Sequence, residues 1–355
     1  MDGIHYLVRE NKKIKALVGA YPVSMEIFCG QEGTMSLPGR GIGAVSVHPY
    51  SRSLGYMKTL MHTAIEDMKR DGIVFSYLQG QRQRYEYYGY TSAGCTVIFN
   101  CTETNITHTM GRQWNTSLTL EKVKADDTAL LDQIHILHEA KSFRMHRSRN
   151  KLFDILSSWK TDIYSINDNG RFFGYFINKN NDSKNNSCIT EIQLLNFSRL
   201  PEVMGLFFRS QNEMGLENTA EIYTGSHELE KITVLSGFAE NYLRIPSCKF
   251  SVFNFPRLTD ALVKFKAASG KIREGSFVLQ IEEKEMRSKI RLFAGKDGAG
   301  AVETDEQPVL SMNSLEAIQF LLSPLAATAN PVIHENTFLQ DILPLPLIIE
   351  NADGM

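Results

Sequence analysis

The stretch VSVHPYSRSLGYMKTLM, residues 45–61, joins three different local patterns. Its first residues alternate between apolar and small polar side chains, which predicts the end of a strand. After a proline, Tyr56, Leu60 and Met61 begin an apolar spacing of three and four residues, which predicts a helix over 55–68. The backbone N–H groups at the start of a helix are unpaired and carry partial positive charge. The junction therefore predicts a binding site for an anion.

Two familiar phosphate-binding patterns do not match this junction. The dinucleotide fingerprint places its glycines after a strand, whereas Gly39, Gly41 and Gly43 come before the strand expected at 44–47 and are expected to form a loop. The phosphate-loop pattern G-x-x-x-x-G-K-[ST] does not occur. What remains is R-x-x-G, in which glycine lets the backbone approach a phosphate and arginine adds a charge-assisted hydrogen bond. Successive N–H groups in such a turn can hold a pyrophosphate.

The composition is that of an ordinary globular protein. The 355 residues predict two or three domains, and 43% hydrophobic with 22% charged residues fits this class. A net charge of -2 gives no reason to expect a nucleic-acid partner. The start lacks the pattern of a secretory signal, and no apolar run reaches the ~18 residues of a membrane span. We therefore expect a cytoplasmic protein without a membrane partner. The five cysteines lack metal or disulfide spacing: Cys29, Cys95, Cys101, Cys188 and Cys248.

Composition and pattern divide the chain into three units. The first alternates strands with the helix 55–68 and ends in a strand expected at 90–99. In the second, Asn169-Gly170 between two β-rich runs predicts a hairpin, and strands again alternate with helices. The third has helices expected at 257–267 and 314–322 and strands at 276–282 and 289–293, followed by the apolar, proline-bearing segment LPLPLIIENADGM, which we expect to lie extended.

The motif at the junction resembles that of the GNAT superfamily of N-acetyltransferases, in which a strand is followed by [QR]-x-x-G-x-[GA]. The run RQRYEYYGYTSAG, residues 82–94, is similar to the Y-x-x-F-G-Y-x-x-A segment of the branch with the mycobacterial "enhanced intracellular survival" enzymes. That branch has a catalytic domain, a second acetyltransferase-like domain without the cofactor motif, and a domain similar to sterol carrier proteins. The resemblance extends over nearly the whole chain.

The resemblance implies a fold of both α/β and α+β character, with tandem GNAT-type mixed sheets flanked by helices and then a sterol-carrier-like α+β domain. The implied domains are 1–102 for cofactor binding and catalysis, 103–249 for the second unit, and 250–355 for the third, whose tail reaches the active site. In the second unit the strand expected at 190–197 is followed by SRLPEV, without R-x-x-G. The first strand and two helices of the catalytic domain are not found before residue 5, so the chain is expected to start late or to have lost them.

The resemblance also implies roles for particular residues, with acetyl-coenzyme A as co-substrate. Tyr85 matches the tyrosine that protonates the departing thiolate, and the free carboxylate of Met355 matches the proposed general base. A backbone N–H near the end of the strand would stabilise the thioester oxygen as negative charge develops. Two positions depart from the family pattern, since Met57 stands where Gly or Ala is usual and Met355 where an aromatic residue is usual. The implied cofactor-binding residues are Val45, Ser46, Val47, Arg52, Ser53, Leu54, Gly55, Tyr56 and Met57.

Structural alternatives stand beside these roles. Tyr85 lies among other tyrosines and packing is the usual role of such a cluster. Arg82 and Arg84 are candidates for the 3′-phosphate of the cofactor or for solvated surface residues. His48 beside the motif is either a base or the end of the strand.

Two histidines, His135 and His138, are three residues apart on a predicted helix, a spacing that can bind a metal. No third ligand is evident in the sequence around them, so we expect ordinary helix residues and no metal.

These observations predict an acetyl-coenzyme A-dependent N-acetyltransferase that transfers the acetyl group directly to a primary amine of a small molecule or to a lysine-like acceptor. No cysteine, or set of Ser, His and Asp, indicates a covalent intermediate. The resemblance further implies a homo-oligomer. A different class remains open, namely a coenzyme A- or lipid-binding module on a degenerate scaffold without catalysis.

Overall fold

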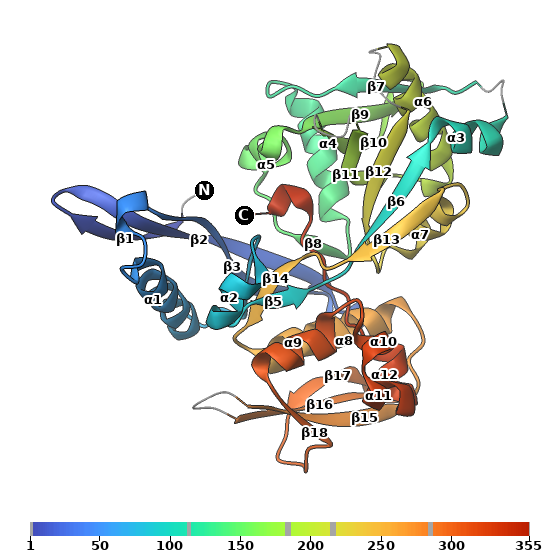
Figure 1. Ribbon diagram of the computed structural model, residues 1–355. Helices are drawn as coiled ribbons and strands as arrows, with labels where there is room; N and C mark the ends of the chain where they lie inside the picture. Colours follow the sequence, from blue (N-terminus) through green and yellow to red (C-terminus); the bar gives the residue numbers. More distant parts are fainter. Residues whose placement is uncertain (1–2, 112–114, 182–185, 214–217, 283–286, 355) are drawn as a thin grey trace.

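The computed structural model describes residues 3–111, 115–181, 186–213, 218–282 and 287–354. It is a mixed α/β structure in which three sheets and their helices surround the C-terminal segment (Figure 1). Among the residues that the structure describes, every helix is too short or too polar to span a membrane. Short 3-10 turns connect many elements: Gly30–Glu32, Pro49–Ser51, Glu86–Tyr88, Arg149–Lys151, Ser158–Lys160, Phe197–Arg199 and Asn351–Asp353.

The first sheet carries the junction motif. Its order is β1-β2-β3-β4-β14-β5, and β8 pairs with β2 beside this path. Helix α1 buries Leu60, Met61 and Met68 against Val18 and Ile42 of the sheet, so the apolar spacing seen in the sequence is the face that packs. The elements are β1 (Ile4–Glu10), β2 (Lys13–Phe28), β3 (Thr34–Val47), β4 (Phe75–Leu78), β5 (Thr91–Ala93), β8 (Phe143–Met145), β14 (Cys248–Val252), α1 (Tyr56–Arg70) and α2 (Arg82–Tyr85).

The second sheet has the order β13-β6-β12-β11-β10-β9-β7. The hairpin predicted at Asn169-Gly170 is confirmed, since Asp168 pairs with Arg171 and both turn residues have positive φ. The strands are β6 (Thr96–Thr102), β7 (Leu118–Lys122), β9 (Asp162–Asp168), β10 (Arg171–Asn181), β11 (Asn186–Leu194), β12 (Thr219–Gly225) and β13 (Asn241–Ile245). The helices are α3 (Glu103–Met110), α4 (Thr128–Glu139), α5 (Leu152–Leu156), α6 (Leu200–Glu213) and α7 (Leu229–Ser236).

The third sheet has the order β17-β16-β15-β18. The predicted helix at 314–322 is confirmed, and it begins with a capping box between Asn313 and Glu316. The elements are β15 (Gly275–Glu282), β16 (Arg287–Gly295), β17 (Gly298–Glu303), β18 (Leu310–Asn313), α8 (Phe255–Ser269), α9 (Ser314–Leu322), α10 (Ala326–Ala329), α11 (Pro331–Glu335) and α12 (Thr337–Ile342).

Hydrogen bonding crosses the predicted domain boundaries. The strand expected at 90–99 is two strands, since β5 belongs to the first sheet and β6 to the second. Strand β14, far along the chain, returns to the first sheet and lies between β4 and β5. The boundaries 102/103 and 249/250 therefore stay predictions, because the first and second units exchange strands across both.

The C-terminal segment after α12 lies extended, as predicted, and connects the three units. Leu345 N–H donates to Leu321 O at 2.7 Å, and Cys95 N–H donates to Leu347 O at 2.8 Å. Ile349 N–H then donates to Ser247 Oγ at 2.8 Å. The segment runs from the third unit into the junction between the other two (Figure 1).

Candidate functional site

Strand β3 has an open edge at its C-terminal end. It pairs with β4 only at Gly39, Arg40 and Gly41, opposite Phe75 to Tyr77. On its other side it stays paired with β2 as far as Val47. In the part of the chain that the structure describes, no strand pairs with β3 from Ile42 to Val47 on the β4 side. Backbone groups on such an edge can bind an extended ligand that carries amides. Val45, Ser46 and Val47 therefore lie where the sequence predicts them, at the end of this strand.

A β-bulge interrupts β3 within this open part. Leu17 pairs with Ser46 and Gly19 with Gly43, so two residues of β3, Ala44 and Val45, stand opposite one residue of β2. Ala44 has a φ of 51°, a left-handed conformation that is unusual for a residue other than glycine. A bulge turns the strand and changes the direction of the backbone groups that follow it.

The helix that follows begins without a side-chain cap. Gly55 is the N-cap of α1, with a φ of 78°, and no side chain accepts a hydrogen bond from the first N–H groups. A Cβ atom added at Gly55 would have no other atom within 4 Å. The first turn therefore combines unpaired N–H donors, the positive end of a 15-residue helix and open space. This is the geometry that an anionic group can occupy.

The residues around Gly55 are mostly exposed. Arg52, Ser53 and Leu54 are exposed, and Arg52 makes no ion pair with a described residue. Tyr56 and Met57 are half-buried against the same apolar cluster as Val45 and Val47. The hydroxyl of Tyr56 also donates a hydrogen bond to Glu10. The larger side chain at 57 is thus accommodated by packing under the helix.

Tyr85 lies in α2 and is buried, with 7% of its surface exposed. Its ring belongs to the apolar cluster that underlies α1, and Gly80 must lack a side chain because a Cβ there would lie 2.5 Å from that ring. Burial raises the pKa of Tyr85, although Arg84 opposes this shift. The phenol is therefore protonated at neutral pH, and it makes no hydrogen bond to a described residue. Packing and proton donation are compatible roles for this residue.

Two of the other basic candidates, Arg82 and His48, make contacts in the structure. Arg82 Nε lies 3.0 Å from Glu86 Oε1, which favours the surface role over a phosphate contact. The backbone N–H of His48 donates to Lys15 O at 2.8 Å, so the backbone at His48 continues the pairing of the strand end, a contact that does not involve the imidazole.

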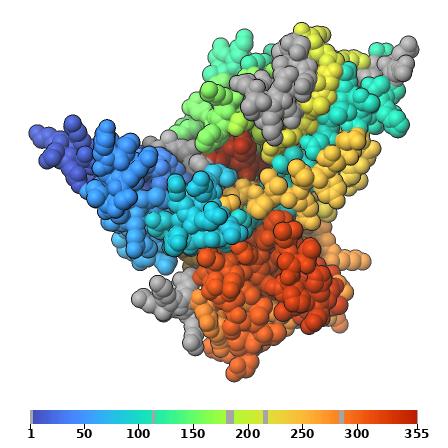
Figure 2. Space-filling model, viewed as in Figure 1, coloured from blue at the N-terminus to red at the C-terminus, as the bar shows by residue number. Residues whose placement is uncertain are grey.

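The C-terminal segment ends beside β4. The hydroxyl of Tyr77 donates to the carbonyl oxygen of Asp353 at 2.6 Å, and Tyr77 is the residue at which the pairing of β3 with β4 stops. The indole nitrogen of Trp159 lies 3.9 Å from the position of a Cβ on Gly354. Met355, the predicted base, lies outside the described residues. Figure 2 shows the C-terminal residues at the bottom of a hollow between the first and second units.

A cavity of about 220 Å³ opens at this place. Strand β2 contributes Pro22 and Val23, and β4 contributes Tyr77. The second unit and the C-terminal segment form the opposite wall, with Met145, His146 and Asp353 among the lining residues. The cavity thus adjoins the point where the β3–β4 pairing stops.

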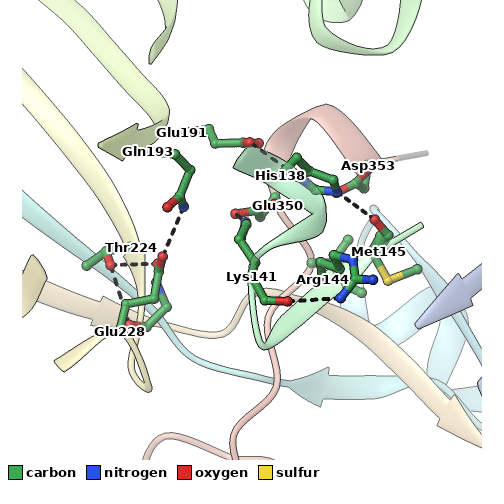
Figure 3. A network of polar contacts seen from close by, with 12 residues as sticks. His138, Lys141, Arg144, Met145, Glu191, Gln193, Thr224, Glu228, Glu350 and Asp353 are labelled. Atoms are coloured by element: carbon green, nitrogen blue, oxygen red, sulfur yellow. Dashed lines mark hydrogen bonds and ion pairs between the residues drawn. The ribbon is translucent and has the colours of Figure 1, made fainter. Parts of the chain in front are cut away.

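A buried ionic cluster lies next to the cavity, and the sequence analysis did not find it. It contains His138, which stands together with Glu191 and Glu350 with ligand atoms within 4.8 Å of one another. Figure 3 shows these side chains and Asp353 converging from three elements. Both glutamates come from distant parts of the chain, so no third ligand is evident in the sequence around His138.

The cluster does not suit a metal ion. Arg147 and Lys141 pair with its carboxylates, and Arg147 Nη1 lies 3.4 Å from His138 Nδ1. The other ring nitrogen of His138, Nε2, forms a hydrogen bond with Met145 O at 2.9 Å. Burial lowers the pKa of His138 to about 2, and Arg147 and Lys141 add to this effect. The positive charges that a metal would supply are already present as side chains.

Comparison with known proteins gives a match for the first part of the chain. Residues 2–97 match the family model of an acetyltransferase (GNAT) domain. No curated protein sequence matches the chain.

Three solved structures are similar over most of their length. A conserved protein from Enterococcus faecalis V583, described as a probable N-acyltransferase, has a TM-score of 0.68 at 16% identity, with 98% of this chain and 87% of that chain covered. A GCN5-related N-acetyltransferase from Kribbella flavida has a TM-score of 0.65 at 15% identity, with 98% and 86% covered. Eis1 from Mycobacterium abscessus has a TM-score of 0.61 at 10% identity, with 94% and 86% covered. These likenesses show that the chain shares their fold.

Proposed function

We propose that this chain, whose residues 2–97 match an acetyltransferase (GNAT) domain, transfers the acetyl group of acetyl-coenzyme A to a primary amine. One observation carries the proposal: the open edge of β3 leads directly into the uncapped start of α1 at Gly55. An extended arm with amides, joined to a pyrophosphate, has the chemistry that these two features bind.

The binding residues have separate roles in this proposal. Backbone groups of Val45 and Val47 pair with the amides of the pantetheine arm. N–H groups from Arg52 to Tyr56, the segment that also contains Ser53, Leu54 and Gly55, hold the pyrophosphate. A backbone N–H at Val45 or Ser46, next to the bulge, donates to the thioester oxygen as charge develops on it.

Two proton transfers complete the reaction. The acceptor amine loses a proton as its nitrogen bonds to the acetyl carbon, and the sulfur of coenzyme A gains one as the thioester bond breaks. Tyr85 is the proposed donor to sulfur, since its raised pKa keeps the phenol protonated. The carboxylate of Met355 stays the proposed base, and the contact between Tyr77 and Asp353 brings the described end of the chain toward the β3–β4 opening.

The cavity beside Tyr77 is the proposed place of the acceptor. Its volume of about 220 Å³ suits a small amine or the side chain of a lysine. Pro22 and Val23 give it an apolar wall. Membership of the branch with the mycobacterial survival enzymes, a sterol-carrier-like third unit, a homo-oligomer and a cytoplasmic location are further proposals that follow from the resemblance.

A turnover assay tests the proposal. The chain is incubated with acetyl-coenzyme A and a panel of primary amines, and free coenzyme A and N-acetylated product are measured by mass spectrometry. Equal amounts of both products, above a control without protein, would support transfer. Saturable binding of acetyl-coenzyme A without turnover of any amine would instead indicate the binding module.

A further inference from the structure

Arg147 is the charged side chain of the buried cluster that forms the most hydrogen bonds to described residues. Only 1% of it is exposed. Its guanidinium donates to Glu191 through two nitrogens, at 2.9 and 2.8 Å. It donates to Asp353 through two nitrogens as well, at 2.9 and 2.8 Å, and to Glu350 at 3.1 Å. Arginine is suited to this arrangement because its planar fork forms two parallel bonds to a carboxylate.

The partners of Arg147 come from different parts of the molecule. Glu191 lies in β11 of the second unit, whereas Glu350 and Asp353 belong to the C-terminal segment. The backbone near Arg147 is fixed as well, because His146 N–H donates to Ser24 O of β2 at 2.8 Å. Arg147 therefore connects three parts: the strand β2 that lines the cavity, the second unit and the C-terminal segment.

The rest of the cluster completes this connection. The hydroxyl of Tyr175 donates to Glu191, and Lys141 pairs with Glu350. Figure 3 shows Lys141, Glu191, Glu350 and Asp353 around His138. Each carboxylate of the cluster has a cationic partner, which is the condition under which buried charges are tolerated.

The C-terminal segment needs such an anchor because its last turn has few other bonds. Residues Asn351–Asp353 form one 3-10 turn without a side-chain cap. Beyond the bonds within that turn, its described polar contacts are those of Asp353 with Arg147 and with Tyr77. Without the Asp353–Arg147 pair, the polar contacts of the turn's own residues are reduced to the hydrogen bond from Tyr77, beside the packing of Ala352 and the ion pairs of Glu350 before the turn.

We propose that Arg147 is a positioning residue, which holds the turn Asn351–Asp353 beside the β3–β4 opening through its paired hydrogen bonds to Asp353. This inference rests on the proposed function, in which the C-terminal segment forms part of the acyl-transfer site. Arg147 itself does not touch the reacting atoms. Arg147 therefore affects the reaction indirectly, because it fixes the position of the C-terminal segment.

The test uses Asp353→Asn, which keeps the side-chain volume and leaves Arg147 paired with Glu191. Glu139→Gln is the matched control, because it breaks the ion pair of Glu139 with Arg144, at 3.0 Å, on the neighbouring α4 and β8. Among the described residues, that pair makes no hydrogen bond or ion pair with the C-terminal segment. Both variants, with Asp353→Glu as the conservative version, are compared with the wild-type chain.

Two readouts separate positioning from general destabilisation. Amide hydrogen exchange, followed by mass spectrometry, reports on residues 343–354, and it should accelerate in Asp353→Asn alone. For acetyl transfer, kcat should fall about 100-fold, because a displaced group at a reaction site has effects of this size, while the Kd for acetyl-coenzyme A stays within about twofold. Asp353→Glu should recover part of the kcat.

The possible results have distinct meanings. If hydrogen exchange of residues 343–354 is the same in Asp353→Asn as in the wild-type chain, Arg147 does not anchor the segment, whatever the acetyltransferase activity of the variant. Faster exchange with an unchanged kcat would overturn the positioning role. A wild-type chain that binds no acetyl-coenzyme A would refute the proposed function, and the exchange measurement would still decide whether Arg147 anchors the segment.

Discussion

Gly55 is the residue on which the proposed cofactor site depends most. Its φ of 78° and the open space around it place the first N–H groups of α1 where an anion can approach. Gly55→Glu would add a side chain and a negative charge in that space. We expect binding of acetyl-coenzyme A to weaken at least about 100-fold, measured by isothermal titration calorimetry.

Gly72→Glu is the control for this change. Gly72 has a φ of 68° at the opposite end of the same helix, and a Cβ there would also have no atom within 4 Å. Both variants therefore have a similar backbone cost. Equal affinities for the two variants would show that the start of α1 does not bind the cofactor.

Tyr85 is the second residue whose role can be measured directly. Tyr85→Phe keeps the buried ring and removes the hydroxyl group that is the proposed proton donor. We therefore expect kcat to fall about 100-fold while the affinity for acetyl-coenzyme A stays the same. Steady-state kinetics and calorimetry check the two parts. Tyr87→Phe, in the same segment but with 86% of the residue exposed, should change neither. If Tyr85→Phe retains full turnover, its role is packing alone.

Individual site residues can be predicted from the sequence where they belong to a local motif. Arg52, Gly55 and Tyr85 each belong to a pattern of a few neighbouring residues, so they could be predicted. Arg147 could not, because its partners Glu191 and Asp353 lie 44 and 206 positions away. Such a cluster has no signal in the sequence beyond charged residues in otherwise apolar stretches.

At the scale of elements, the loop predicted at the glycines before the junction is wrong. Gly39, Gly41 and Gly43 lie within β3, which begins at Thr34, and do not form a loop. For Gly39 the reason is packing, because a Cβ there would lie 2.4 Å from the ring of Phe75 in the neighbouring strand. A glycine that is required by a distant aromatic ring has the same appearance in the sequence as one in a loop.

This contact gives a stability prediction. Gly39→Ala should destabilise the protein by about 1–3 kcal/mol, since the methyl group would overlap a fully buried ring. Urea denaturation followed by circular dichroism measures the change. Gly295→Ala is the control, because no atom lies within 4 Å of its added Cβ. Similar free energies of unfolding for the two variants would mean that the ring of Phe75 can move aside without loss of stability.

The C-terminal segment has a pH-dependent contact at Glu350. Its pKa is raised to about 7 by burial and by Glu191, with Asp353 adding to the shift and with Lys141 and Arg147 opposing it. The raised pKa means that the folded state binds the proton more tightly than the unfolded chain, for which the usual value is 4.5. The stability that Glu350 contributes is complete below that value and is lost as the pH rises through about 7.

Glu350→Gln isolates this contribution, because glutamine does not titrate. The free energy of unfolding of the wild-type chain, relative to the variant, should fall between pH 5 and pH 8. Urea denaturation at several pH values measures the difference, in which the titrations of other groups largely cancel. A difference that does not change with pH would contradict the assignment.

At the scale of the whole molecule, individual helices and hairpins are easier to predict than the sheet to which each strand belongs. Helices such as α9 and hairpins such as β9–β10 follow from local periodicity and turn residues. The pairing of β14 with β4, and of β6 with β12, depends on contacts over long separations. Local patterns do not specify which sheet a strand joins.

The proposed site lies where the predicted units meet. The first unit supplies β3, α1 and Tyr85, the second supplies Arg147, and the segment after the third unit supplies Asp353. The cavity beside Tyr77 has walls from the first unit, the second unit and the C-terminal segment. The proposed reaction therefore requires the assembled chain and not the first unit alone.

Calorimetric titration of the whole chain with acetyl-coenzyme A tests the central claim most directly, with NAD as the control ligand. We expect saturable binding of acetyl-coenzyme A at one site per chain and no binding of NAD. No heat of binding from acetyl-coenzyme A to the folded chain, or equal binding of NAD, would contradict the assignment of the β3–α1 junction as a coenzyme A site.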